Sequence, residues 1–76
     1  MFEDITKFEF QGVVYYQEHG NFFDRGSADS YYNRKPTPHR GGVGGDTGPR
    51  RLASNDQERA EYMAGYGWNE QFGHKK

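Results

Sequence analysis

A stretch near the middle of the chain restricts what the rest can fold into. Residues 36–51, PTPHRGGVGGDTGPRR, contain three prolines and five glycines and no hydrophobic periodicity, which is typical of an extended loop. The whole chain has only 76 residues, so we expect one small domain, residues 1–76. A loop of this length in a small domain is either functional or disordered, and we predict that residues 36–53 are flexible.

The core must be built mainly from aromatic side chains. The sequence has six Phe, six Tyr and one Trp, and each aromatic side chain buries about 150–250 Å². Cysteine is absent, which excludes disulfides and cysteine-ligated zinc as sources of stability. We therefore expect a thin, marginally stable core with tyrosine hydroxyls at its edge.

The first part of the chain, residues 1–23, has the pattern of a β-hairpin. In the segment TKFEFQGVVYYQ, Phe8 and Phe10 alternate with charged residues, and two β-branched and two aromatic residues follow Gln11 and Gly12. This pattern predicts two antiparallel strands joined by a tight, glycine-containing turn. One longer irregular strand is the alternative.

A first helix is predicted over residues 24–35. Asp24 or Ser27 can cap its N-terminus, and the first proline of the loop ends it. The helix is short and needs tertiary contacts to form. We expect its adjacent tyrosines, Tyr31 and Tyr32, to close the core.

A second helix is predicted over residues 54–72, with acidic residues in its first turn. Two pairs can form its capping box: Ser54 with Gln57, or Asn55 with Glu58. Residues 73–76 are expected to be a frayed tail. The predicted fold class is therefore α+β, with an N-terminal β-hairpin packed on two short helices that a Gly/Pro-rich loop joins.

The chain has no run of roughly 18–20 apolar residues and no secretory signal pattern. We therefore expect a soluble, cytoplasmic protein without a membrane partner. Charge is unevenly distributed along it: residues 1–24 and 52–73 are acidic, whereas residues 34–51 carry five cationic side chains against one acidic one. We call residues 34–51 the basic block.

The basic block and nearby aromatic residues suggest contact with RNA. Arginine and lysine pair with phosphates, and exposed tyrosine or tryptophan stacks on unpaired bases. The candidate binding residues are Arg34, Lys35, His39, Arg40, Arg50, Arg51, Tyr31 and Trp68. In the alternative interpretation, the aromatic residues belong to the core and the arginines only keep a loop soluble.

The sequence lacks the residue patterns of an enzyme or a metal site. It contains no cysteine, no His-Glu-x-x-His and no Gly-x-Ser-x-Gly. His19, His39 and His74 lie in three different segments without metal-ligand spacing, so we expect exposed loop histidines. The glycine-rich segment lacks the Lys-Ser/Thr of a nucleotide-binding loop. We expect no catalysis, no metal, no cofactor and no small-molecule substrate.

Two segments, RGSADSYYNRKPTPHR and ERAEYMAGYGWNE, resemble the layout of the ribosome modulation factor family and of short bacteriophage proteins. The matching positions are Arg25, Gly26, Asp29, Tyr32, Arg34, Pro38, His39, Arg59, Tyr62, Gly65, Tyr66 and Trp68. The resemblance implies a small helical protein that binds ribosomal RNA and neighbouring ribosomal proteins. This chain differs from that family in its near-neutral charge and its leading hairpin.

The leading hypothesis is a small non-enzymatic modulator that docks on a larger host protein or ribonucleoprotein complex, with the ribosome or RNA contacting the central basic loop. The alternative is a phage-type inhibitor whose acidic flanks and exposed aromatic residues bind a basic host protein. A structural component that self-associates is a third hypothesis.

Overall fold

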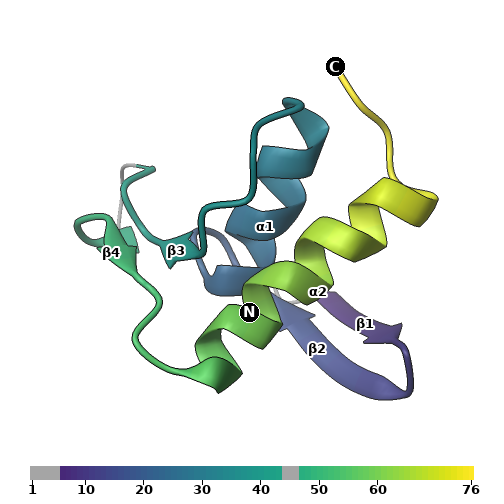
Figure 1. Cartoon of the computed structure of the whole chain (residues 1–76), viewed down its shortest axis with the longest axis horizontal. Helices are drawn as coiled ribbons and strands as arrows, with labels where there is room; N and C mark the ends of the chain where they lie inside the picture. The colour runs from purple at the N-terminus through teal and green to yellow at the C-terminus, as the bar shows by residue number, and fades with distance from the viewer. Residues whose placement is uncertain (1–5, 44–46) are drawn as a thin grey trace, which may run out of the picture.

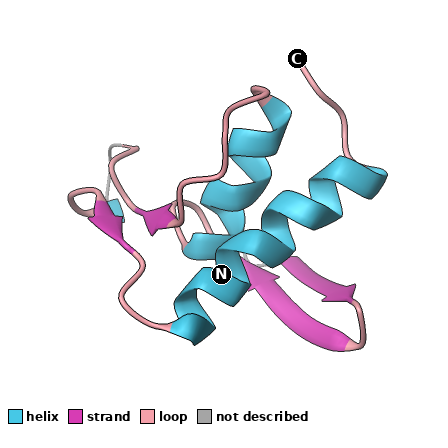
Figure 2. Cartoon of the chain, in the orientation of Figure 1, coloured by secondary structure: helices cyan, strands magenta, loops and turns pink. Residues whose placement is uncertain are grey.

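The described part of the chain contains two helices, a β-hairpin and a second, very short pair of strands (Figures 1 and 2). The computed structural model describes residues 6–43 and 47–76. In chain order the elements are β1 (Thr6–Phe10), β2 (Val13–Gln17), α1 (Phe22–Tyr31), β3 (His39–Arg40), β4 (Arg51–Leu52) and α2 (Asp56–Phe72). The predicted α+β class, a hairpin with two helices, is confirmed.

The N-terminal hairpin forms as the alternating pattern predicts. β1 and β2 pair antiparallel, with Phe8 opposite Tyr15. Gln11 and Gly12 have φ values of 52° and 79°, which is the paired left-handed backbone of a two-residue hairpin turn. Phe8 and Tyr15 pack on Phe23 of α1, with ring centroids 5.0 and 5.7 Å away. The hairpin therefore covers one side of the core.

Helix α1 begins earlier and ends earlier than predicted. Its N-cap is Asn21, whose side-chain oxygen accepts a hydrogen bond from the Asp24 N–H at 2.9 Å. The expected caps Asp24 and Ser27 were wrong, because the Asp24 carboxylate instead accepts the Gly20 N–H at 2.8 Å. Asn33, with φ of 59°, turns the chain out of the helix before the prolines are reached.

The two helices touch through their backbones. A Cβ added at Gly26 of α1 would overlap the carbonyl oxygen of Tyr62, and one added at Gly65 of α2 would overlap the carbonyl oxygen of Phe23. Only glycine allows this close crossing, which Figure 1 shows at the centre of the molecule. The buried core, Phe22, Phe23, Tyr62 and Ala64, surrounds the crossing.

The segment predicted to be a flexible loop, residues 36–53, contains ordered structure. His39 pairs with Leu52 and Arg40 with Arg51 in an antiparallel ladder, which we call the β3–β4 ribbon. The Ala53 N–H also donates to the Pro38 carbonyl at 3.0 Å. The prediction of a flexible loop was wrong for these paired residues, and residues 44–46 lie outside the described part of the chain.

Helix α2 ends at Phe72 as predicted and begins two residues late. Asn55 is its N-cap and accepts the Glu58 N–H at 2.8 Å, so the second of the two proposed pairs is present. The Glu58 carboxylate reaches one residue further back and accepts from the Ser54 N–H at 2.8 Å. The cap therefore fixes residues on both sides of the helix start.

Residues 73–76 are bound to α1, so the prediction of a frayed tail was wrong. The Lys76 N–H donates to the Tyr31 carbonyl at 2.7 Å, and the Asn33 side chain donates to the Lys76 carbonyl at 3.1 Å. Asn69 donates to the carbonyl of His74 at 3.0 Å. These bonds satisfy polar groups at the ends of both helices.

Tyr31 and Tyr32 do not close the core. They are 39% and 46% exposed, whereas Tyr62 is fully buried. The early end of α1 places the two tyrosines at the helix terminus, beyond the crossing. None of the described helices is long and apolar enough to cross a membrane.

Candidate functional site

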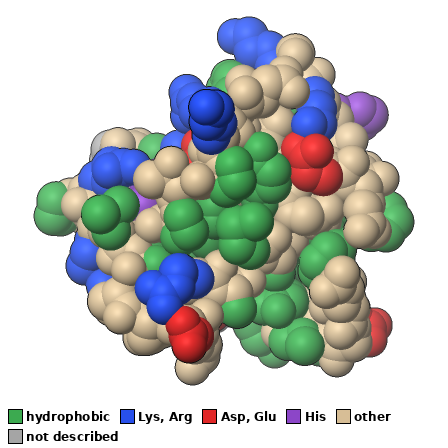
Figure 3. Space-filling model, in the orientation of Figure 1, with side chains coloured by type: hydrophobic (Ala, Val, Ile, Leu, Met, Phe, Trp, Pro, Cys, Tyr) green, Lys and Arg blue, Asp and Glu red, His purple; other side chains and the backbone are tan. Residues whose placement is uncertain are grey.

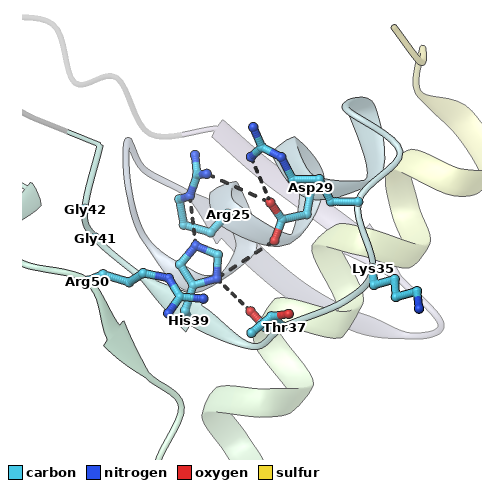
Figure 4. Close-up of a pocket in the computed structure, with 9 residues that line it drawn as sticks. Arg25, Asp29, Lys35, Thr37, His39, Gly41, Gly42 and Arg50 are labelled. Carbon is cyan, nitrogen blue, oxygen red and sulfur yellow. Dashed lines mark hydrogen bonds and ion pairs between the residues drawn. The ribbon is translucent and has the colours of Figure 1, made fainter.

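A hollow of about 430 Å³ opens between α1, the segment that follows it and the β3–β4 ribbon (Figure 4). Cationic side chains dominate its lining, and we call it the cationic hollow. The cations are Arg25, Arg34, Lys35 and Arg50, with His39 and the carboxylate of Asp29 between them. The site therefore gathers residues that lie far apart in the sequence.

Asp29 is the buried anchor of this site. Its carboxylate accepts a hydrogen bond from the Tyr62 hydroxyl. Arg34 Nη1 lies 3.3 Å and Arg25 Nη2 lies 4.0 Å from Asp29 Oδ1. A buried carboxylate is stable only when it is paired and hydrogen-bonded. Asp29 is thereby neutralised, and it fixes the two arginines at the wall of the hollow.

Helix α2 supports the hollow from below through two tyrosines. The buried hydroxyl of Tyr62 donates to Asp29 and accepts the Thr37 N–H at 3.0 Å. Burial, followed by the hydrogen bond to Asp29, raises the pKa of Tyr62, so the hydroxyl stays protonated. The Tyr66 hydroxyl donates to the Arg34 carbonyl at 2.6 Å. Both bonds hold the segment between α1 and β3 in place.

His39 is buried, so the prediction of an exposed loop histidine was wrong for this residue. The Nε–H of Arg25 donates to His39 Nε2 at 3.3 Å. Because Nε2 accepts, the ring proton is on Nδ1, which donates to the Thr37 carbonyl 2.6 Å away. His39 therefore orients Arg25 and has no ring nitrogen left for another partner.

The hollow has more positive than negative charge. Arg25 and Arg34 share the single carboxylate of Asp29. Within the described ranges, neither Lys35 nor Arg50 has a carboxylate in ion-pair distance. Figure 3 shows Lys and Arg side chains gathered on the side of the molecule that carries the β3–β4 ribbon. This arrangement attracts anions.

The glycines of the hollow do not cradle an anion with their amides. Gly41 and Gly42 both have φ of 74°, a conformation that favours glycine. Their N–H groups donate to the carbonyls of Gly20 and Gly48 at 2.7 and 2.9 Å. The amides of these two glycines are therefore not available to an anion, and the glycines shape the wall of the hollow.

Arg40 and Arg51 lie on the opposite face of the β3–β4 ribbon, and we call them the arginine pair. Side chains alternate across a strand, so Arg40 and Arg51 project away from the face of His39. Their guanidinium carbons lie 5.8 and 5.6 Å from the ring centroid of Phe22. Arg51 also contacts Glu58 at 3.1 Å.

The pKa of Glu58 is lowered to about 2, chiefly by the hydrogen bond from the Ser54 backbone and then by the one from Arg51. The arginine pair therefore contacts groups of the protein itself, the ring of Phe22 and the carboxylate of Glu58. It lies apart from the hollow.

The structure thus brings together only part of the predicted site. Arg34, Lys35, His39 and Arg50 line the hollow, whereas Arg40, Arg51, Tyr31 and Trp68 do not. Tyr31 packs its ring edge-on against Tyr32 at 4.9 Å. Trp68 packs on Phe8 of the hairpin at 4.6 Å, away from the hollow.

Asp29 was missed as a site residue, and Arg25, which the sequence marks as one of several arginines able to pair with phosphates, was not among the candidate binding residues. Arg25 and Asp29 lie four positions apart in α1, so they share one helix face. That spacing was visible in the sequence, but their burial against β3 was not. No group of three or more potential metal-ligating side chains occurs in residues 6–43 and 47–76.

Comparison of the chain with protein-family models, curated proteins and solved structures found no match. The resemblance to the ribosome modulation factor family therefore stays a prediction.

Proposed function

We propose that this protein is a non-enzymatic modulator that docks on a larger ribonucleoprotein complex, such as the ribosome, by binding RNA in the cationic hollow. One observation carries the proposal: among the residues that the structure describes, four cationic side chains and one carboxylate line the hollow, and that carboxylate is already paired. Arginine binds phosphate oxygens with two parallel hydrogen bonds, and lysine adds a point charge. The hollow suits a phosphate of a nucleic acid.

A binding role fits the hollow better than catalysis. A general acid or base needs a titratable group within reach of a substrate. Both ring nitrogens of His39 are hydrogen-bonded to protein groups. The Asp29 carboxylate and the Tyr62 hydroxyl are hydrogen-bonded to each other below the surface. The groups with the right chemistry are thus engaged in fixing the cations.

The proposal is tested by measuring the fluorescence anisotropy of a labelled single-stranded RNA with increasing protein. The double variant Lys35→Ala/Arg50→Ala removes the two cations that have no carboxylate partner in the described structure. We expect it to weaken binding and to reduce the slope of log affinity against log salt by roughly 1.4, since each phosphate contact in single-stranded RNA contributes about 0.7.

The matched control is Lys7→Ala/Arg59→Ala, which removes the same charge outside the hollow. We expect a smaller loss of affinity, caused only by the change in net charge. If both double variants weaken binding equally, the attraction is nonspecific and the proposed site is wrong. Absence of RNA binding by the wild-type protein, even at about 50 mM salt, would refute the proposed function itself.

The partner is then sought by pull-down from bacterial lysate with and without nuclease. Recovery of ribosomal proteins that disappears after nuclease treatment supports the RNA-binding modulator. The Lys35→Ala/Arg50→Ala protein should recover less of them than the Lys7→Ala/Arg59→Ala control.

A second candidate function is inhibition of a basic host protein. A separate cleft of about 300 Å³ is lined by three glutamates, one arginine and several aromatic side chains; its charged residues are Glu18, Glu58, Glu61 and Arg40. This acidic, aromatic surface suits a cationic partner. One stoichiometric partner that survives nuclease treatment, and that is lost in Glu18→Gln/Glu61→Gln, would favour this function over RNA binding.

A further inference from the structure

Arg25 differs from the other cations of the hollow because it lies deepest. Its side chain is only 13% exposed, whereas that of Arg34 is 54% exposed and Lys35 and Arg50 are also exposed. Figure 4 shows its guanidinium between His39 and Asp29. Arg25 therefore forms the floor of the hollow, and the other three cations form its rim.

The guanidinium of Arg25 has unfilled hydrogen-bond donors. In the described part of the chain, its Nε–H is the one guanidinium N–H with a hydrogen bond, to His39. The 4.0 Å separation from Asp29 is an ion pair but is too long for a hydrogen bond. No described side-chain nitrogen or oxygen is both fully buried and without a partner, so the remaining donors of Arg25 are not fully buried, and Arg25 is one of the residues that line the hollow.

One wall of the hollow is closed by tight backbone packing. A Cβ at Gly41 would lie 2.6 Å from the Pro49 carbonyl oxygen, and one at Gly42 would lie 2.9 Å from Arg50 Cβ. The chain segments on this side cannot approach more closely. Closely packed chain therefore forms this side of the hollow.

We infer that the cationic hollow binds the terminal phosphate of an RNA strand in preference to phosphates within the strand. This inference rests on the proposed function. A terminal phosphate has one ester linkage, three free oxygens and a charge near −2 at neutral pH. It can project past the rim and accept hydrogen bonds from Arg25 as well as from Arg34 and Arg50. A phosphate within a strand continues into ribose on both sides and contacts the rim alone.

The surface beside the rim favours RNA as the source of this phosphate. The Arg34 guanidinium lies 4.8 Å from the ring centroid of Tyr32, and Tyr32 packs edge-on against Tyr31. Both tyrosines are exposed. Unpaired bases stack on arginine planes and aromatic rings. The terminal base can therefore stack beside its bound phosphate.

The test compares three RNA strands of one sequence, internally labelled: one with a 5′-phosphate, one with a 3′-phosphate and one with hydroxyls at both ends. We expect either the 5′-phosphate strand or the 3′-phosphate strand to bind roughly tenfold more tightly than the hydroxyl strand. About two added charge-assisted hydrogen bonds allow this difference. Arg25→Gln should abolish this preference, so that the phosphorylated and hydroxyl strands bind the variant with equal affinity. Thermal melting of the variant checks that it folds.

If Arg25→Gln does not fold, Arg25→Lys replaces it, because lysine keeps the charge and loses the planar fork; we expect the preference to fall. Equal binding of all three strands, weakened by Lys35→Ala/Arg50→Ala, would overturn the inference and leave the proposed function intact. No binding of any strand would refute both. A further outcome is that a nucleoside monophosphate or a phosphoserine peptide displaces the strand at equal concentration. That result would assign the hollow to the displacing ligand and refute the terminal phosphate of RNA as its ligand.

Discussion

The cationic hollow and the arginine pair are built from the same basic block, yet they differ in what surrounds their charges. In the hollow, Lys35 and Arg50 have no carboxylate partner among the described residues. In the arginine pair, both guanidinium groups lie over Phe22, and Arg51 also contacts Glu58. Charges of the first kind are available to a ligand, whereas those of the second kind stabilise the fold.

The start of β4 separates the two regions. Arg50 and Arg51 are neighbours in sequence, but Arg50 precedes β4 and Arg51 is its first residue, paired with Arg40. Arg50 lines the hollow and Arg51 covers Phe22. A cluster of positive charge in a sequence therefore does not define one surface.

The largest expected effect is that of Gly65→Ala, which breaks the helix crossing beneath both regions. The new methyl group would overlap the backbone of Phe23, and backbone cannot move aside as a side chain can. Overpacking costs about 1–3 kcal/mol and occasionally more. We expect a loss of about 3 kcal/mol, or roughly 12–24 °C in melting temperature, measured by circular dichroism.

Gly67→Ala is the matched control on the same helix. Its methyl group would lie 3.0 Å from the movable ring of Phe10, and alanine stabilises a helix interior by up to about 1 kcal/mol over glycine. We expect an unchanged or higher melting temperature. Equal losses in both variants would mean that the helices do not cross as closely as the structure has them.

Tyr62→Phe changes the hollow and leaves the contacts of the arginine pair in place. It removes the hydroxyl that donates to Asp29 and accepts from the Thr37 N–H, so the buried Asp29 carboxylate and the Thr37 N–H each lose one hydrogen bond. The expected cost is about 1–3 kcal/mol in urea unfolding, accompanied by weaker RNA binding because Asp29 fixes Arg25 and Arg34. Tyr66→Phe, which loses one hydroxyl nearer the surface, should cost less; the reverse order would contradict the assignment of Asp29 as the anchor.

The sequence predicts the elements better than their ends. The hairpin followed from the alternation around Phe8 and from Gln11-Gly12, since both signals are local. The start of α1 was misplaced because Asp24, a good cap by type, is used by Gly20. The predicted end of α1 is wrong because the left-handed turn at Asn33 comes before the proline that we expected to end the helix.

The sequence predicts the positive charge of the candidate site but not how its residues are arranged in space. Arg34, Lys35 and Arg50 belong to the basic block, and composition alone marks them. The burial of His39 and its bond to Arg25 depend on β3 packing against α1. That contact joins residues fourteen positions apart, and no local pattern encodes it.

Arg51→Ala and Arg50→Ala sharpen the comparison at adjacent positions. Arg51→Ala uncovers Phe22 and breaks the contact with Glu58, so we expect a loss of about 1 kcal/mol in urea unfolding and RNA affinity close to wild type. Arg50→Ala should do the opposite, with weaker binding and nearly unchanged stability. If both variants lose binding alike, the hollow and the arginine pair act as one surface.

Acid should weaken the contact between the arginine pair and Glu58. The pKa of Glu58 is lowered from 4.5 to about 2, so its stabilising contribution is fully present above pH 4.5 and is lost as the pH falls from 4.5 towards 2. The effect is small because Glu58 is near the surface. Melting of wild type and Glu58→Gln at several pH values measures it, and we expect the two curves to converge at low pH. A difference in melting temperature that does not change with pH would mean that the ionisation of Glu58 does not cause it.

The smallest expected effect on stability is that of Lys35→Ala/Arg50→Ala. Surface substitutions without a partner change stability by about 0.5 kcal/mol or less. Here the sign is informative, because removing two cations from a cluster of four relieves repulsion. We expect a slightly higher melting temperature at low salt and no difference at about 1 M salt, where screening acts within about 3 Å. A lower melting temperature at all salt concentrations would mean that these cations stabilise the fold as the arginine pair does, and the distinction between the two regions would disappear.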